Sequence, residues 1–211
     1  MKKRVFSALL ALVLTLSAVV LPASAAGSFS DVSDKKTAQN VEVLRLLGVV
    51  EGNGIGQFNP YAQLTRAEFC KMLVTLMGSS DVLRYKTVTI FPDVRASHWA
   101  ARYVNYAVRG EKLLAGLPDG TFQPNQNITR EQMVTFLARY AQLQDVDTAS
   151  SAELDFTDAG SVSDYAQEAM AWAVETGLVQ GMGNGKLDPK GPATRAQMAT
   201  VLMRFCESIL K

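Results

Sequence analysis

Histidine and cysteine are scarce in this chain. Its 211 residues include one histidine, His98, and two cysteines, Cys70 and Cys206. No Cys–His or Ser–His arrangement can be proposed from these, so a hydrolase would have few groups to build on. His98 precedes Trp99 at the expected start of a helix, where a capping or surface role is typical. We therefore predict no catalytic residue, no metal site and no cofactor, and that the protein is not an enzyme.

An excess of positive charge is also missing. The chain has 21 Lys and Arg against 20 Asp and Glu. Without Lys2, Lys3 and Arg4, which belong to an expected leader, 18 remain against 20 and the net charge is near −2. Such a protein has no general attraction for nucleic acid or anionic lipid. We expect no nucleic-acid partner, and any anion must be recognised by individually placed arginines.

Long apolar runs are absent except at the N-terminus. Residues 5–21 are almost wholly apolar, follow a basic start, and precede Pro22 and the small residues Ala23-Ser24-Ala25. This pattern indicates a secretory signal peptide over residues 1–25. A retained membrane anchor is the alternative, because the apolar run is long for a signal peptide. No later stretch is apolar enough to span a bilayer, so we expect a secreted protein without a membrane span in its mature part.

One short element, Thr-Arg-x-Glu/Gln, occurs three times. Its arginines are 64 and then 65 residues apart, which indicates tandem repeats. We place the repeats at residues 28–78, 91–141 and 156–210, and each is too short to bury a core alone. The three copies are Thr65-Arg66-Ala67-Glu68, Thr129-Arg130-Glu131-Gln132 and Thr194-Arg195-Ala196-Gln197.

Each copy has the form of a helix-capping box. The threonine is the expected N-cap, and the Glu or Gln at the third helical position can bond back to the N-cap amide. Apolar residues follow at helical spacing three, four, seven and eight positions after the arginine. Three such helices can bury these faces only against one another. The predicted fold is therefore mainly α: three helix–loop–helix repeats around a central three-helix core with pseudo-threefold symmetry.

The first half of each repeat begins with Phe-x-Asp. We interpret Asp31, Asp93 and Asp158 as caps of the turn into a first helix. That helix is clearest at residues 99–108 and 165–174, which begin with Trp99 and Tyr165, whereas the first repeat has Lys36 at the aromatic position. The second repeat has one extra residue near Arg109-Gly110.

A glycine-rich loop separates the two helices of each repeat. Its first glycine (Gly52, Gly116 or Gly181) suits a helix C-terminus that needs a positive φ. The apolar residue near its end (Phe58, Phe122 or Leu187) is expected to insert into the core. The loops lack the dense series of oxygen ligands that calcium requires, so their aspartates indicate turns.

Both cysteines fall on apolar helix faces. In parallel helices they would differ by seven positions, roughly 10 Å along the axis, which exceeds the reach of a disulfide. Buried free thiols are therefore favoured over a bridge.

Taken together, these motifs resemble the S-layer homology (SLH) domain over about residues 28–210. The shared features are Phe-x-Asp, an aromatic-Ala helix start, Gly-x-Pro-Asp-Gly-x-Phe-x-Pro and Thr-Arg-Ala-Glu, and residues 91–141 match best. The resemblance implies a three-pronged spindle around the central helices. It also implies attachment to secondary cell-wall polysaccharide or a peptidoglycan-linked glycan, at the cell wall or surface layer.

The resemblance further implies which residues bind. A pyruvate ketal carboxylate on the polysaccharide would meet Arg66, Arg130 and Arg195 in grooves between repeats. Trp99 and Tyr165 would support the sugar, together with backbone amides of the glycine loops at Gly116 and Gly120. The further candidate ligand-binding residues are Asp31, Asp93 and Asp158. Departures from the family pattern at Lys36, at Gly183-Asn184-Gly185, and at Gln132 and Gln197 leave the number of working grooves open.

Physical chemistry supports an anion at these arginines. Each occupies the first position of a helix, where a cation is unfavourable by roughly 0.3–1 kcal/mol. The alternative is an ion pair with Asp31, Asp93 or Asp158 within the repeat. For the protein as a whole, the alternatives are a structural subunit that assembles with other surface proteins, or the targeting part of a larger enzyme or complex.

Overall fold

The computed structural model describes residues 29–87 and 89–209, and the expected signal peptide lies outside these residues. The described chain is mainly helical, as predicted. We refer to the three repeats as units 1, 2 and 3. The α-helices are α2 (Lys35–Leu46), α3 (Arg66–Leu76), α4 (Ala101–Asn105), α5 (Arg130–Leu143), α6 (Gln167–Glu175) and α7 (Arg195–Ile209). Shorter elements are η1 (Ser80–Tyr85), the π-helix η2 (Tyr106–Gly110), η3 (Ala159–Ser161) and η4 (Asp164–Ala166).

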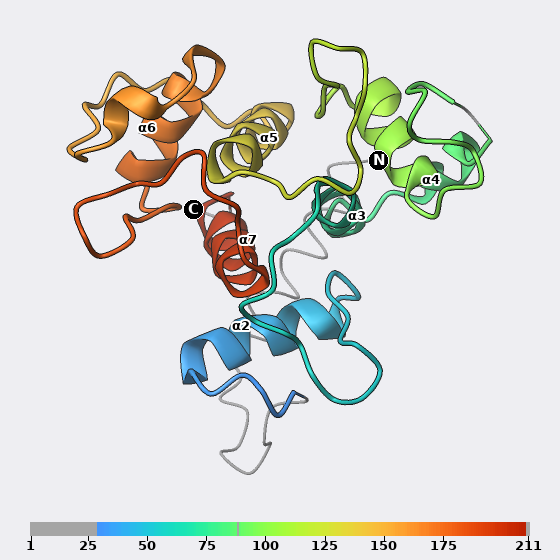
Figure 1. The fold of residues 1–211 in the computed structure, drawn as a ribbon, viewed down its shortest axis with the longest axis horizontal. Helices are drawn as coiled ribbons and strands as arrows, with labels where there is room; N and C mark the ends of the chain where they lie inside the picture. The colour runs from blue at the N-terminus through green and yellow to red at the C-terminus, as the bar shows by residue number, and fades with distance from the viewer. Residues whose placement is uncertain (1–28, 88, 210–211) are drawn as a thin grey trace.

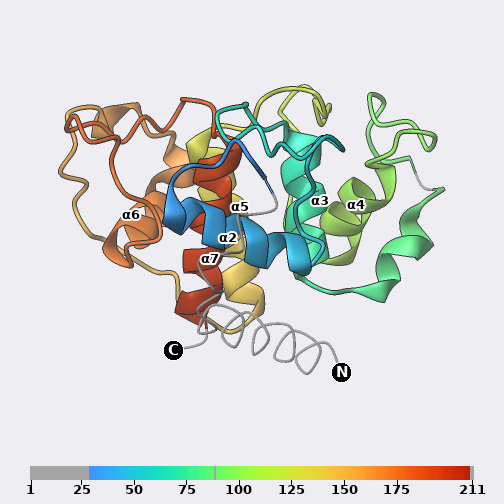
Figure 2. The same ribbon diagram turned by 90° about the horizontal axis from the view of Figure 1, so that it is seen from below.

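The second helices of the units lie at the centre of the molecule and the first helices lie outside them. Figure 1 shows α3, α5 and α7 around the middle, with α2, α4 and α6 in three arms. Each outer helix packs on the central helix of a different unit: α4 on α3, α6 on α5, and α2 on α7. Figure 2 shows α2 crossing in front of α7. The expectation that the central helices bury their apolar faces only against one another is therefore wrong.

Large aromatic side chains connect the central helices. Phe69 of α3 stacks on Phe136 of α5, with ring centroids 6.1 Å apart. Tyr140 of α5 stacks on Phe205 of α7 at 5.6 Å. The apolar positions that the repeat predicts on these helices are buried, and so are the loop residues Phe58, Phe122 and Leu187.

The capping boxes form as predicted. In α3 the Thr65 side chain accepts the Glu68 N–H while the Glu68 carboxylate accepts the Thr65 N–H. Thr129 and Gln132 make the same pair at α5, and Thr194 and Gln197 make it at α7. These residues have a structural role at all three helix starts.

Backbone hydrogen bonds connect the units in cyclic order. The amide of Arg66 donates to the carbonyl of Gln126 (2.9 Å), that of Arg130 to Gly191 (3.0 Å), and that of Arg195 to Ala62 (2.9 Å). Unit 1 thus bonds to unit 2, unit 2 to unit 3, and unit 3 back to unit 1. The start of each central helix is thereby fixed against the loop of the next unit.

The aspartates of the Phe-x-Asp motif do not cap the first helices. The N-cap of α2 is Asp34. Asp31 instead accepts the amides of Phe58 (2.8 Å) and Asn59 (2.7 Å) in its own glycine loop. Asp93 and Asp158 bond the equivalent amides of units 2 and 3. The capping interpretation was wrong because the real partners lie 27–30 residues away.

The first glycine of each loop is required for a different reason from the one predicted. Gly52, Gly116 and Gly181 are not among the positive-φ residues. A Cβ at each would instead collide with the phenylalanine ring of the Phe-x-Asp motif, at 2.6 Å for Gly181 and Phe156. Glycine is required here because a ring lies against the backbone.

Two other sequence features are explained. The extra residue near Arg109 is absorbed by the π-helix η2, in which the Glu111 amide bonds the Tyr106 carbonyl five residues earlier. Cys70 and Cys206 are buried free thiols, as favoured. Burial raises the pKa of both, to about 12 for Cys206, which keeps them unreactive.

Candidate functional site

Each repeat arginine reaches into the glycine loop of the next unit. Nε of Arg66 donates to the Phe122 carbonyl (2.8 Å), and Nη2 reaches toward the Ala115 carbonyl at 3.5 Å. Arg130 makes the matching bonds to Leu187 (2.9 Å) and Gln180 (3.0 Å). These bonds leave Nη1 of each guanidinium for another partner.

Arg195 closes the cycle on unit 1. It donates to the carbonyls of Phe58 (2.8 Å) and Glu51 (2.7 Å), and its guanidinium lies 4.4 Å from the Phe58 ring centroid. Arg66 lies over Phe122 in the same way, at 4.8 Å. The three arginines therefore pin three loops across the three interfaces between units.

Burial differs among the arginines. Arg66 and Arg130 are 2% and 4% exposed, whereas Arg195 is only partly buried. Burial lowers the pKa of all three guanidinium groups; nearby Asp93 opposes this at Arg66, Asp158 at Arg130, and Asp31 at Arg195. Because these guanidinium groups lie in a region of low dielectric constant, a negative charge placed beside them interacts with them more strongly than it would in water.

The aspartates face the arginines of a neighbouring unit and not those of their own. Asp93 of unit 2 influences Arg66 of unit 1. The Asp93 carboxylate bonds backbone amides of the loop that Arg66 holds by its carbonyls. The ion pair within one repeat, which the sequence left as an alternative, is therefore replaced by an indirect link between units.

Two pockets of comparable size contain a repeat arginine. The Arg195 pocket has a volume of about 300 Å³, and its lining also includes Glu51, Asn53, Gln63 and Glu68. The Arg130 pocket has a volume of about 250 Å³. It is lined by Thr37 of unit 1, by the unit 3 loop and by α7, in particular Ala196, Gln197 and Arg204. Each pocket joins an arginine, the loop it pins and the helix that follows that loop.

The two predicted aromatic residues have exposed rings. Trp99 is 51% exposed and stacks on His98, whose Nδ1 accepts the Ala100 amide. Tyr165 is 55% exposed, but its hydroxyl donates to Glu131 at 2.9 Å. Trp99 is thus free to stack on a ligand, whereas the polar end of Tyr165 is already engaged. Trp172 is buried in the core, as expected.

The predicted loop residue Gly120 has a φ of +79°, which makes the turn at the tip of the unit 2 loop possible. Its amide donates to the Leu117 carbonyl at 3.0 Å. Gly116 lies under the Phe91 ring at the start of the same loop. Both therefore shape the loop that Arg66 holds.

Sequence reasoning missed the cluster around Glu131. This carboxylate is 3% exposed and accepts from the Ser163 amide (3.0 Å), the Ser163 hydroxyl (3.0 Å), the Tyr165 hydroxyl and Lys190 Nζ (2.8 Å). Lys190 also contacts the Ser163 hydroxyl. Burial acts to raise the Glu131 pKa, but the bonds from Lys190, Ser163 and Tyr165 outweigh it and lower the pKa. The available signal was the acidic residue where the other two copies have Ala67 and Ala196.

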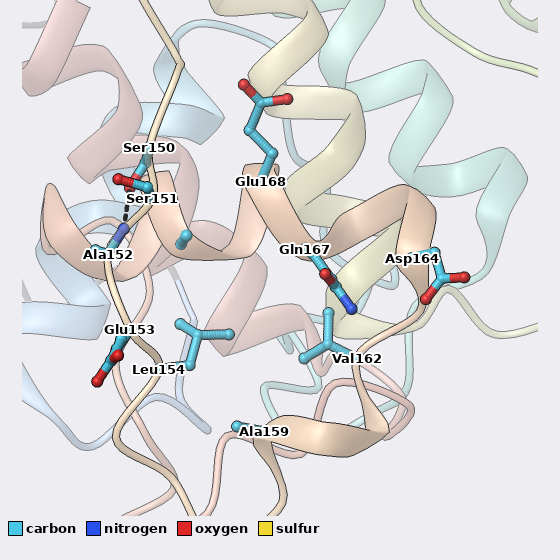
Figure 3. A pocket seen from close by; sticks show the side chains of 11 residues that line it. Ser150, Ser151, Ala152, Glu153, Leu154, Ala159, Val162, Asp164, Gln167 and Glu168 are labelled. Carbon is cyan, nitrogen blue, oxygen red and sulfur yellow. Dashed lines mark hydrogen bonds between the residues drawn. The ribbon is translucent and has the colours of Figure 1, made fainter.

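A hollow of about 740 Å³ is lined by none of these residues. Figure 3 shows it between α6 and the segment 150–154, with Leu154, Val162 and Ala159 around it and Asp164 near one end. None of the predicted ligand residues lines it. We therefore do not assign it to the candidate site.

Within residues 29–87 and 89–209, no cluster of three or more His, Cys, Asp or Glu could hold a metal ion. Over the same part of the chain, no helix has both the length and the apolar character that crossing a membrane demands.

Comparison with known proteins gives a consistent result. A family model described as the S-layer homology domain matches residues 28–70, 90–134 and 155–199. The chain is 32% identical over 184 residues to an amylopullulanase of Thermoanaerobacterium thermosulfurigenes, covering 85% of this chain and 10% of that protein. It is 31% identical over 212 residues to an endoglucanase of Bacillus sp. (strain KSM-635), covering 95% and 22%.

A third relative is a surface-layer 125 kDa protein of Lysinibacillus sphaericus. It is 29% identical over 212 residues, which cover 98% of this chain and 17% of that protein. The chain thus spans between a tenth and about a fifth of the length of these relatives.

Proposed function

The chain belongs to the S-layer homology domain family, and we propose that it attaches to anionic secondary cell-wall polysaccharide through the pockets between its units. It is a cell-surface anchoring module by family. The ligand would carry a carboxylate, in line with the pyruvate ketal that the resemblance implies. Attachment would be non-covalent and would need no catalytic residue.

The observation that carries this proposal is the threefold recurrence of one arrangement. A guanidinium at the start of a central helix is fixed by two backbone carbonyls of the next unit. The fixed group cannot turn away, and the bonds to the loop use Nε and Nη2, which leaves Nη1 for another partner. Pre-positioned charge-assisted donors of this kind favour a carboxylate over a neutral sugar.

The Arg195 pocket is the main candidate. Arg195 is the least buried of the three arginines. By the repeat equivalence with Tyr165, Trp99 would face this pocket from unit 2. An exposed indole can stack on a sugar while the guanidinium meets the carboxylate. We therefore expect this pocket to contribute most of the affinity.

The test is sedimentation of the protein with purified wall sacculi in three forms. These are complete sacculi, sacculi stripped of secondary polymer, and sacculi whose polymer lacks the ketal. We expect binding to the first only, reduced by raised salt because the contact is electrostatic. Equal binding to all three forms would refute the proposal.

A second candidate is association with another surface protein. Ile55 and Tyr61 on unit 1 are 78% and 83% exposed, and exposed apolar side chains that form a patch can mark a site of protein association. If this candidate is right, a variant with both residues changed to serine loses its surface position while its binding to sacculi in vitro is unchanged. The same test applies if the chain is the targeting part of a larger enzyme or complex.

A further inference from the structure

The three interfaces between units are not equivalent, although the repeat makes them similar. At the Arg130 pocket, Ala196 lines the wall beside Thr37 of the next unit's first helix. The equivalent position in unit 1 is Ala67, which is also alanine. In unit 2 it is Glu131, so one of the three interfaces has a carboxylate where the others have a methyl group.

The Glu131 carboxylate bridges units 2 and 3. It accepts from Ser163, Tyr165 and Lys190, all in unit 3, and is nearly fully buried. Two hydroxyls, one amide and one ammonium group converge on it within 3.0 Å. This is the donor set that a carboxylate ligand would need, and the chain's own carboxylate occupies it.

The cluster lies beside Arg66, the arginine that holds the unit 2 loop. Tyr165 is close enough to Arg66 to influence the pKa of that guanidinium, and its hydroxyl bonds Glu131. Arg66 is also the most deeply buried of the three arginines. An incoming carboxylate would meet a fixed negative charge, a neutralised Lys190 and hydroxyls that already donate.

We propose that Glu131 acts as a built-in ligand that closes the Arg66 site to anionic polymer. Binding is then confined to the Arg195 and Arg130 pockets. This inference rests on the proposed function, because it concerns which of the anion sites is open. It assigns Glu131 as the residue that determines the number and position of those sites.

The decisive variant is Glu131→Ala, which gives unit 2 the alanine already present in the other two units. It frees Lys190, Tyr165 and Ser163 to receive an outside carboxylate. The probe is the methyl glycoside of a hexose carrying a 4,6-linked pyruvate ketal, titrated calorimetrically into the full chain. The ketal-free glycoside is the ligand control, and Glu153→Ala, which removes one acidic residue at the outer hollow, is the variant control.

We expect one more binding site in Glu131→Ala than in the original chain or in Glu153→Ala. The double variant Glu131→Ala with Lys190→Ala loses most of that gain, about tenfold or more in affinity. If the original chain binds the probe and Glu131→Ala binds it with the same stoichiometry, the inference is overturned and the proposed function stands. If neither binds it, both are overturned.

A second measurement needs no variant. In the original chain, amide signals of Asn53 and Gln63 at the Arg195 pocket should shift when the probe is added, while that of Ser163 should not. A shift of Ser163 equal to that of Asn53 overturns the inference even if Glu131→Ala fails to fold.

Discussion

Asp93 and Arg66 hold the same loop residue, Phe122, from its two backbone ends. The Asp93 carboxylate accepts the Phe122 amide at 3.0 Å, and Arg66 Nε donates to the Phe122 carbonyl at 2.8 Å. One anchor belongs to the loop's own unit and the other to the preceding unit. The same relationship recurs at Leu187 and Phe58, so each arginine has a structural role whether or not it binds a ligand.

Removing a buried repeat arginine should therefore destabilise the protein. Arg130→Ala leaves the Leu187 and Gln180 carbonyls without a donor, which we expect to lower the free energy of unfolding by roughly 2–4 kcal/mol. Urea denaturation followed by circular dichroism measures this. Arg84→Ala is the control, because Arg84 makes only an exposed ion pair with Asp81 that is expected to contribute less than about 1 kcal/mol. Equal effects of the two variants would contradict this account of Arg130.

Trp99→Ala should weaken binding without weakening the fold. The ring is half exposed, so its loss removes little packing, whereas a stacked sugar would lose its support. We expect affinity for sacculi to fall about tenfold, with a melting temperature within about 2 °C of the original. Leu83→Ala, at a residue that is also largely exposed, is the matched control. A large fall in melting temperature would show that Trp99 is a packing residue.

The first glycine of each loop should not tolerate a side chain. A Cβ at Gly116 would collide with the Phe91 ring and lie 2.9 Å from the Thr121 carbonyl oxygen. We expect Gly116→Ala to destabilise by roughly 1–3 kcal/mol through overpacking. Gly160→Ala is the control, since a Cβ there has no neighbour within 4 Å and φ is not positive. Thermal unfolding of both variants distinguishes them.

Asp158 should make stability depend on pH. The Leu187 amide, and with it that of Asp188, lowers the Asp158 pKa below its ordinary value. A lowered folded-state pKa gives stability that is present above the unfolded value of about 3.9 and is lost as pH falls through the folded value. Asp158→Asn should thus be less stable at pH 6, with the difference shrinking below about pH 4. Urea titrations at each pH test this, and a constant difference would contradict it.

The capping boxes and the buried helix faces were predictable because their determinants are local. Thr65 and Glu68 are three residues apart, and helical spacing identifies Phe69 and Leu73 as core residues without further information. Helix class, repeat number and the free cysteines follow from the same local patterns.

The roles of Asp93 and Gly116 were not predictable in this way. Their partners, Phe122 and Phe91, lie more than twenty residues away, and nothing in the spacing links a carboxylate to those amides. Short-range rules therefore supplied a plausible but wrong role for each residue. The packing of α2 on α7 was missed for the same reason, because it joins opposite ends of the chain.

The ligand role of the arginines stays a prediction. Helix-end electrostatics identified them correctly as unusual, and the loop carbonyls explain part of that placement without a ligand. Glu131 was visible only as a departure from the other copies. Its importance depends on Lys190 and Tyr165, which no sequence rule brings together.

The contact of Arg195 with Phe58 and Glu51 spans 137 and 144 residues of sequence. An open array of repeats can fold from one end and lose its last repeat with little harm to the first. Here the loop and outer helix of unit 1 contact α7, which is synthesised more than a hundred residues later. Unit 1 should accordingly be the region most sensitive to a premature stop before α7, and folding should be slow to begin and cooperative once the ring closes.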